Sequence, residues 1–383
     1  MRKKLICLIC VLALSFNSAI LVFAQSNVPS AQLDVNAKAA VLMEASTGQI
    51  LYESNPDEQL PIASVTKIMT MLLIMEALDS GKIQMDEMVT ASERAKSMGG
   101  STMFLETGEQ LSVHDMLKGI AVASANDGCV AMAEHIAGSE AGFVQMMNDR
   151  AKELGMEHTQ FVNTNGLDAD GHYSSARDVA IMSRALISHE KIFEFTTIWM
   201  DSLRDGKFQL ANTNKLVRFY KGANGLKTGS TSKAKCCLSG TAKRDDMQLI
   251  AVVLGAPTSK ERFASASSML DYGFANYAVK KQVTQDESLG TVKVTKGEAD
   301  VVNAVAKDTY SMLSAKGAQN AIEKNVQLDS EICAPVEKGQ VIGKAEIVSD
   351  GQVIAQVDVV AGETVAKKPF GSVLLDIFKK LVG

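Results

Sequence analysis

The 383-residue chain is 46% hydrophobic and 22% charged, a composition typical of a folded protein with two or three domains. Its formal net charge of −5, without a long basic run, argues against a nucleic-acid partner. Beyond residue 24 it contains neither C-x-x-C nor H-E-x-x-H, so we expect no zinc site, and no motif calls for a cofactor.

Residues 1–24 have the pattern of a secretory signal peptide. Basic residues at positions 2–4 precede an apolar stretch at 5–14, and small residues before position 25 predict cleavage after Ala24. The alternative is an uncleaved N-terminal anchor, although Asn17 and Ser18 interrupt the apolar run. Cleavage would leave 36 basic residues against 44 acidic ones, a formal charge of −8, in an exported protein.

Strand-like and helix-like segments alternate over residues 35–278. The segments Lys38–Met43 and Gln49–Tyr52 flank a turn and predict a hairpin. An apolar run from Ser64 to Leu78, without Gly or Pro, predicts a buried helix. Further helices are expected at 112–121, 125–137, 140–154, 175–188 and 260–276, and strands at 236–243 and 247–255. Strands at both ends of this region favour an α/β sandwich whose chain ends meet in one sheet.

Ser64 and Lys67 open the apolar helix. The i, i+3 spacing puts their side chains on one helix face, within reach of each other. A serine hydroxyl needs a base to become a nucleophile, and a lysine serves only if burial or a neighbouring cation lowers its pKa. S-x-x-K alone is a weak signal, because Ser230 with Lys233 and Ser232 with Lys235 match it in a polar run without an apolar helix.

Two more short motifs follow along the chain. Ser124-Ala125-Asn126 precedes one predicted helix, and Lys227-Thr228-Gly229-Ser230 precedes the predicted strands. Each has a structural alternative, because Ser124 and Asn126 could cap a helix and Lys227-Thr228-Gly229 could be a loop entering a strand. The three motifs occur together in this order, and the first of them begins a buried helix in a chain predicted to be exported. This combination favours a catalytic serine.

The cysteines show no ligand pattern. Cys129, Cys236, Cys237 and Cys333 lie beyond the predicted cleavage site. Cys236 and Cys237 are adjacent, which is an unfavourable geometry for a disulfide between them. We therefore expect free thiols, the alternative being one disulfide, which an exported protein can form.

The composition changes after about residue 278. Valines alternate with polar residues around Val292, Val326 and Val353–Val359, and Asp350-Gly351 is a hairpin signal. We expect a small β-rich domain over 279–365.

Residues 367–383 then place apolar side chains at i, i+3, i+4, i+7 and i+8 from Phe370, beside several lysines. This predicts an amphipathic helix lying on a membrane surface, the alternative being a helix packed on the β-rich domain.

The chain resembles the low-molecular-mass penicillin-binding proteins that are serine-type D-alanyl-D-alanine carboxypeptidases. The resemblance rests on the three motifs within Leu60–Thr70, Ser124–Asn126 and Asn224–Gly229, and on Phe161-Val162-Asn163 leading to Asn165-Gly166-Leu167. It is strong over 35–275 and weak over the β-rich domain and tail. It implies a β-lactamase/DD-peptidase-like α/β domain, an antiparallel sheet with helices, followed by a β-rich domain and an anchoring tail helix.

The resemblance also implies the roles of the catalytic residues. Ser64 would be acylated, Lys67 would be its base, and Ser124 would relay a proton to the leaving amine. Asn126 would bind the substrate amide. Backbone N–H groups of Ser64 and Ser230 would form the oxyanion hole.

The resemblance implies that the third motif and one arginine recognise the free carboxylate of the substrate. Lys227 would supply positive potential, and Thr228, followed by Gly229, would contact the carboxylate. Arg262 matches a family arginine that holds this group, the alternative being a surface arginine paired with Glu261 or Asp271. The substrate would be a peptidoglycan stem peptide at the outer face of the cytoplasmic membrane, and β-lactam antibiotics would be inhibitors.

Other functions fit less well. A class A-like β-lactamase would carry a deacylating glutamate in an E-x-x-L-N segment, and an α/β-hydrolase would carry G-x-S-x-G; the chain has neither. An inactive peptidoglycan-binding module would not need all of these motifs. The chain departs from the family at Ala125, where relatives have Asp or Gly, and at Lys235-Cys236-Cys237, where many have Gly-Tyr and a polar residue.

Overall fold

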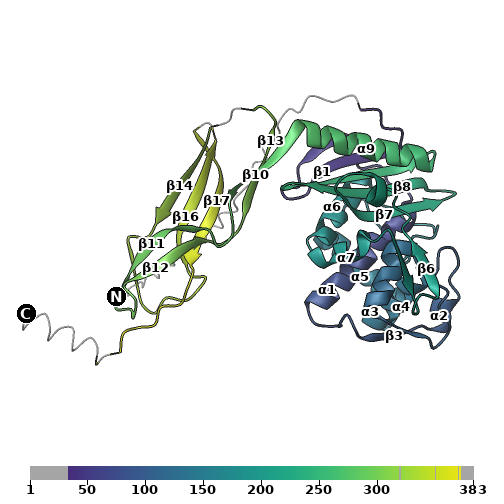
Figure 1. Ribbon diagram of the computed structural model, residues 1–383, viewed down its shortest axis with the longest axis horizontal. Coiled ribbons are helices and arrows are strands. Elements are labelled where there is room, and N and C mark those ends of the chain that lie inside the picture. Colours follow the sequence, from purple (N-terminus) through teal and green to yellow (C-terminus); the bar gives the residue numbers. More distant parts are fainter. Residues whose placement is uncertain (1–32, 319–320, 350, 370, 372–383) are drawn as a thin grey trace, which may run out of the picture. The chain divides into compact units, whose positions relative to one another are not determined.

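The computed structural model describes residues 33–318, 321–349, 351–369 and 371 (Figure 1). The predicted signal peptide at 1–24 and nearly all of the predicted tail helix lie outside these residues.

A five-stranded antiparallel sheet organises the first part of the described chain. Its strands, in spatial order, are β2 (Ile50–Ser54), β1 (Ala39–Glu44), β9 (Met247–Ala256), β8 (Lys235–Arg244) and β7 (Ala223–Thr231). β1 pairs with β2 as a hairpin, and residues 39–44 of β1 pair with 249–254 of β9. The predictions of a hairpin here and of one sheet joining the two ends of this region are therefore confirmed.

Helices cover both faces of this sheet (Figure 1). They are α1 (Lys67–Asp79), α2 (Glu93–Lys96), α3 (Val113–Lys118), α4 (Asn126–Ala137), α5 (Glu140–Glu153), α6 (Ala176–Ile187), α7 (Phe193–Thr196), α8 (Leu216–Phe219) and α9 (Ser259–Asn276). The side chains of Ser139, Ser175 and Thr258 accept backbone N–H groups where α5, α6 and α9 begin. Two short hairpins join the helices: β3 (Met88–Thr90) with β4 (Gln110–Ser112), and β5 (Met200–Leu203) with β6 (Phe208–Ala211).

The main hydrophobic core lies between the sheet and the helical layer around α1. Helix α1 is buried nearly all round, as its uninterrupted apolar sequence predicts. Alternate residues of β9, Ile250, Val252 and Leu254, enter the same core. Helix α9 packs on β8 and β9, and α6 packs on β1 and β9 (Figure 1). The N-terminal end of α1 is thereby fixed beside the edge strand β7.

Two predicted helices differ from the observed ones where they approach this edge. The helix expected from Ser64 begins with a 3-10 turn, Ala63–Thr66, before α1. The helix expected at 112–121 changes after α3 into a π-helical turn, Gly119–Ala123, and the chain leaves it through Ser124 in the left-handed region, at φ +65°. Short non-α turns of this kind often occur at functional sites.

The C-terminal part of the described chain is β-rich, as expected. A six-stranded sheet has the order β14 (Ile322–Leu328), β16 (Val341–Ser349), β17 (Gln352–Ala361), β12 (Val301–Ala306), β11 (Ser288–Thr295) and β15 (Glu331–Cys333). Strand β10 (Tyr277–Val283) pairs with β13 (Tyr310–Ala315).

The expected hairpin turn at 350–351 is supported by the pairing of Ser349 with Gln352, although residue 350 itself lies outside the described residues. The alternation expected from Val353 holds only in part. Val357 and Val359 are buried, whereas Val353 is 52% exposed. Val353 lies near the hairpin end of β17, and β12 covers that strand only from residue 359 to 361.

Candidate active site

Ser64 and Lys67 meet at the start of α1, as their spacing predicts. Lys67 Nζ donates a hydrogen bond to Ser64 Oγ over 2.9 Å. The same nitrogen donates to Asn126 Oδ1 over 2.7 Å and to the main-chain oxygen of Asn165 over 2.6 Å. These three acceptors match the three N–H groups of an ammonium. The two other S-x-x-K matches lie in β7, in the turn that follows it and at the start of β8, so neither of their serines heads a helix.

Burial changes the acidity of Lys67. The side chain is fully buried, and loss of water lowers its pKa to about 8, although Cys129 and Asp127 nearby act in the opposite direction. At neutral pH about one-tenth of such a lysine is already an amine. In that form two N–H groups can stay on Asn126 Oδ1 and the Asn165 carbonyl, which leaves the lone pair for the Ser64 proton.

Ser124 and Asn126 lie at the end of the π-helical turn and the start of α4, and Asn126 contacts Lys67. Neither caps a helix, because the residue before α4 is Ala125, which makes no capping bond; the capping alternative is therefore wrong. Asn126 Nδ2 donates to Gly99 O over 2.7 Å, which turns its oxygen toward Lys67. Ser124 is 4% exposed and holds the left-handed conformation that ends the π-helical turn.

Asp127 fastens the loop that holds Asn126. Its buried carboxylate accepts the N–H groups of Met103 and Leu105 at 3.0–3.1 Å. Asn126 N in turn donates to Ser101 O over 2.7 Å. A carboxylate that accepts several backbone donors holds a loop more firmly than neutral contacts do. No sequence motif indicates this role of Asp127.

Strand β7 carries the third motif along the edge of the sheet. Lys227 is buried, and its Nζ donates to Thr228 O over 2.9 Å. Burial, then the neighbouring Lys67 and Arg262, lower the pKa of Lys227 well below its usual value. Gly229 lies so close to the nucleophile that an added Cβ would stand 2.9 Å from Ser64 N. Only glycine permits this approach of the two backbones.

Arg262 reaches β7 from α9. It is 6% exposed, and its Nη1 donates to Gly229 O and Cys237 O, each over 3.1 Å. The alternative of a surface arginine paired with Glu261 or Asp271 is wrong, because the arginine is buried and bonds to carbonyls of β7 and β8. Among described atoms, Arg262 Nε is buried without a hydrogen-bond partner.

The cysteines of this region do not pair. Cys129, Cys236, Cys237 and Cys333 are all free thiols. Cys236 faces Ser230 across the β7–β8 pair, and the buried Cys237 thiol donates to Ala234 O over 3.4 Å.

A loop at 163–167 supplies the main-chain acceptor for Lys67. The sequence predicts no role for Asn163–Leu167 beyond its part in the family resemblance. Asn163 Oδ1 accepts the N–H groups of Asn165 and Gly166, and Asn163 Nδ2 donates to Leu167 O over 2.9 Å, so the loop is closed by its own side chain. At Gly166, with φ +87°, an added Cβ would stand 1.9 Å from Ala63 O. The loop therefore packs directly on the turn that carries Ser64.

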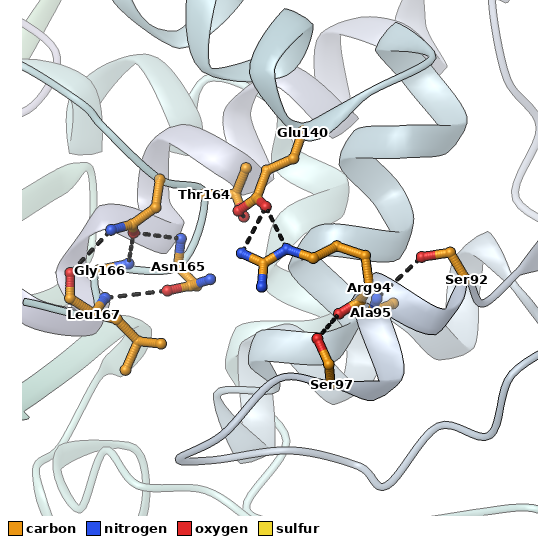
Figure 2. A network of polar contacts seen from close by, with 10 residues as sticks. Ser92, Arg94, Ala95, Ser97, Glu140, Thr164, Asn165, Gly166 and Leu167 are labelled. Atoms are coloured by element: carbon orange, nitrogen blue, oxygen red, sulfur yellow. Dashed lines mark hydrogen bonds and ion pairs between the residues drawn. The ribbon is translucent and has the colours of Figure 1, made fainter. Parts of the chain in front are cut away.

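Helices α2 and α5 hold the same loop from outside. Figure 2 shows Glu140 between Arg94 and Thr164. Arg94 Nη2 lies 2.9 Å from Glu140 Oε2, and Thr164 Oγ1 donates to Glu140 Oε1 over 3.5 Å. Thr164 O also accepts the hydroxyl of Thr70 on α1. These contacts fix the carbonyl of Asn165 relative to α1.

His172 supports the other side of the nucleophile turn. Burial lowers the pKa of His172 to about 4, so its ring is neutral near pH 7. Val162 N donates to Nδ1, so the proton lies on Nε2, which is 2.8 Å from Thr66 Oγ1. Thr66 Oγ1 then donates to Ala63 O over 2.8 Å.

Known proteins match both parts of the chain. The D-alanyl-D-alanine carboxypeptidase family model matches residues 25–258, and that of the penicillin-binding protein 5 C-terminal domain matches 277–367. The D-alanyl-D-alanine carboxypeptidase DacF of Bacillus subtilis is 48% identical over 345 residues, 89% of each chain. The structure of penicillin-binding protein 5 from Haemophilus influenzae superposes with a TM-score of 0.70 at 34% identity, covering 87% of this chain and 98% of the other. Ampicillin-bound penicillin-binding protein D2 from Listeria monocytogenes gives 0.58 at 34% identity, covering 64% and 100%.

Proposed function

The chain belongs to the D-alanyl-D-alanine carboxypeptidase family and is a serine-type D-Ala-D-Ala carboxypeptidase, and on this premise we propose that Ser64 is the nucleophile and Lys67 its general base. One observation carries the proposal: a fully buried lysine whose pKa is lowered to about 8 lies 2.9 Å from the serine hydroxyl. We propose that residues 35–278 carry this chemistry.

Acylation begins with transfer of the Ser64 proton to Lys67 Nζ. Ser64 Oγ then attacks the carbonyl carbon of the penultimate D-alanine and forms a tetrahedral oxyanion. The N–H groups of Ser64 and Ser230 are the proposed donors to that oxyanion. The close approach of Gly229 to Ser64 N supports this assignment, because it brings the two backbones to the same point.

Collapse of the intermediate breaks the C–N bond. The leaving amine of the terminal D-alanine takes a proton from the Ser124 hydroxyl. Ser124 then receives the proton that Lys67 holds. Water then attacks the ester carbonyl and gives a proton to Lys67. The bond between the carbonyl carbon and Ser64 Oγ breaks as Lys67 returns that proton to Ser64 Oγ, which releases the shortened peptide. Asn126 is proposed to bind the substrate amide while its oxygen holds Lys67.

The free carboxylate of the substrate is proposed to bind beside β7. Thr228 would donate its hydroxyl to the carboxylate, and Lys227 and Arg262 would supply positive potential. Burial lowers the pKa of Lys227, and a bound carboxylate would favour its charged form. Arg262 would also keep Gly229 in place through its carbonyl. A carboxypeptidase needs such a site because it recognises a free chain end.

The pH dependence of acylation tests the role of Lys67. Neutral amine becomes more abundant as pH rises, so the second-order rate constant for acylation by benzylpenicillin should increase about tenfold per pH unit below about pH 8 and level off above it. The penicillin carboxylate stays ionised throughout, so the slope reports the enzyme. Circular dichroism should show an unchanged fold over the range. A rate independent of pH between about 6 and 8 would contradict a lysine base.

We propose peptidoglycan stem peptides as substrates and β-lactams as slow substrates that acylate Ser64. The Listeria protein in its ampicillin-bound and cefotaxime-bound forms supports the second point. Both ligands would enter along β7, the edge strand of the sheet, where a peptide could add as a further strand.

The signal peptide at 1–24 and the amphipathic tail at 367–383 together support an enzyme held at the outer face of the cytoplasmic membrane. Among the described residues, no helix is both long enough and apolar enough to cross a membrane. We propose that the tail attaches the enzyme by lying in the interface, with its lysines near anionic headgroups.

Deleting residues 367–383 should release the processed protein from membranes, because the apolar face of the tail is removed. Its activity on a soluble peptide should stay within about twofold of the full-length value, since none of the proposed catalytic residues is lost. Fractionation followed by a D-alanine release assay measures both. Membrane association that persists after the deletion, with signal cleavage verified by mass spectrometry, would exclude the tail as the anchor.

A further inference from the structure

Thr228 has a partner that the three motifs do not contain. Thr213 Oγ1 lies 2.6 Å from Thr228 Oγ1, and the two residues come from different elements. Thr228 is buried on β7, whereas Thr213 is exposed in the segment between β6 and α8. Because a hydroxyl has one proton and can also accept, a pair this close must have one donor and one acceptor.

The segment that carries Thr213 is fixed by the residues on either side. Asn212 Nδ2 donates to Ile198 O over 2.7 Å, and its Oδ1 accepts the N–H of Asn214 over 2.8 Å. Asn214 Nδ2 donates to Gly225 O over 2.7 Å. Both asparagines are buried, and Gly225 belongs to β7, the strand of Thr228. The contact between the threonines is therefore held by a polar network rather than by a free surface side chain.

The direction of this hydrogen bond decides what Thr228 offers a ligand. A carboxylate only accepts hydrogen bonds, so Thr228 must donate to it. Thr228 can then only accept from its neighbour, and Thr213 is placed to be that donor. The resulting order is Thr213 to Thr228 to carboxylate, in which each bond polarises the next.

We infer that Thr213 is a positioning residue for substrate recognition, which directs the Thr228 hydroxyl toward the free carboxylate of the terminal D-alanine. The inference rests on the proposed carboxylate-binding role of Thr228. The required group is the hydroxyl. Serine at position 213 should therefore still direct Thr228, whereas valine, which is similar in shape to threonine but lacks the hydroxyl, should not. The effect should be confined to substrates that present a carboxylate.

Kinetics on two peptides test this inference. Thr213→Val and Thr213→Ser would be measured in the processed enzyme on one peptide ending in D-Ala-D-Ala, as the free acid and as the C-terminal amide. Thr213→Val should lower kcat/KM for the free acid about tenfold, the usual scale for losing one hydrogen bond in a charged network. The amide should change less than about twofold, and Thr213→Ser should stay within about twofold of wild type on both.

A matched control is available at Thr197, which is also exposed, directly follows α7 and donates its hydroxyl to Phe193 O in that helix. Thr197→Val should leave both rates unchanged. Equal losses on acid and amide, no loss with valine, or an equal loss with serine would each overturn the inference. Mapping of a penicillin adduct separates the proposed role of Ser64 from the inference about Thr213. An adduct at Ser64 in every variant would support the proposed mechanism, whatever the kinetics of the Thr213 variants. An adduct at another residue would contradict the mechanism itself.

Discussion

Ser64→Ala should abolish the covalent adduct with benzylpenicillin and lower D-alanine release by at least about a thousandfold. The reason is that Ser64 Oγ is the hydroxyl that accepts from Lys67 Nζ, whose other two acceptors are the amide oxygen of Asn126 and the main-chain oxygen of Asn165. Intact-mass measurement detects the adduct, and peptide mapping locates it. Alanine fits the space of serine, so the melting temperature should change little.

Ser232 provides the matched control for this experiment. It has a lysine three residues later, like Ser64, but lies exposed in the turn between β7 and β8. Ser232→Ala should label as fast as wild type. Adduct formation that survives Ser64→Ala, or that maps to another serine in the wild-type protein, would remove Ser64 from the nucleophile's role.

Lys67→Arg should reduce acylation about as strongly as Ser64→Ala does, because the base rather than the nucleophile is lost. A guanidinium stays protonated at every pH at which the protein folds, so it can donate to Ser64 but cannot take the serine proton. We expect acylation by benzylpenicillin to fall by about a thousandfold or more. The position is fully buried, so the larger arginine could disturb the core. Lys67→Met, which is similar in length and lacks the amine, should give the same loss and serves as a second variant.

The rate constant of acylation, measured by stopped-flow or by gel fluorescence with a labelled penicillin, checks this result. Circular dichroism melting shows whether each variant is folded. Lys235→Arg is the control, because Lys235 belongs to one of the other S-x-x-K matches and is exposed. Near-normal acylation by a folded Lys67→Arg or Lys67→Met protein would exclude Lys67 as the base.

The sequence by itself determined the features that depend on neighbouring residues. The contact between Ser64 and Lys67 follows from helical spacing, which places i and i+3 on one face whatever surrounds them. The unbroken apolar run after Ser64 likewise predicted α1, and the strands expected at 236–243 and 247–255 correspond to β8 and β9. The meeting of the two ends of this region in one sheet was also predicted, from strands at both ends with helices between them.

Only the tertiary structure decided which distant groups complete the site. Asn126 and Asn165 lie 59 and 98 residues from Lys67 along the chain, and Thr213 lies 15 from Thr228. Such contacts depend on how whole elements pack, and no local period encodes that. Two of the partners, Asn165 for Lys67 and Gly229 for Arg262, act through main-chain carbonyls, which every residue type possesses. A sequence motif records side chains, so it cannot reveal an acceptor that the backbone supplies.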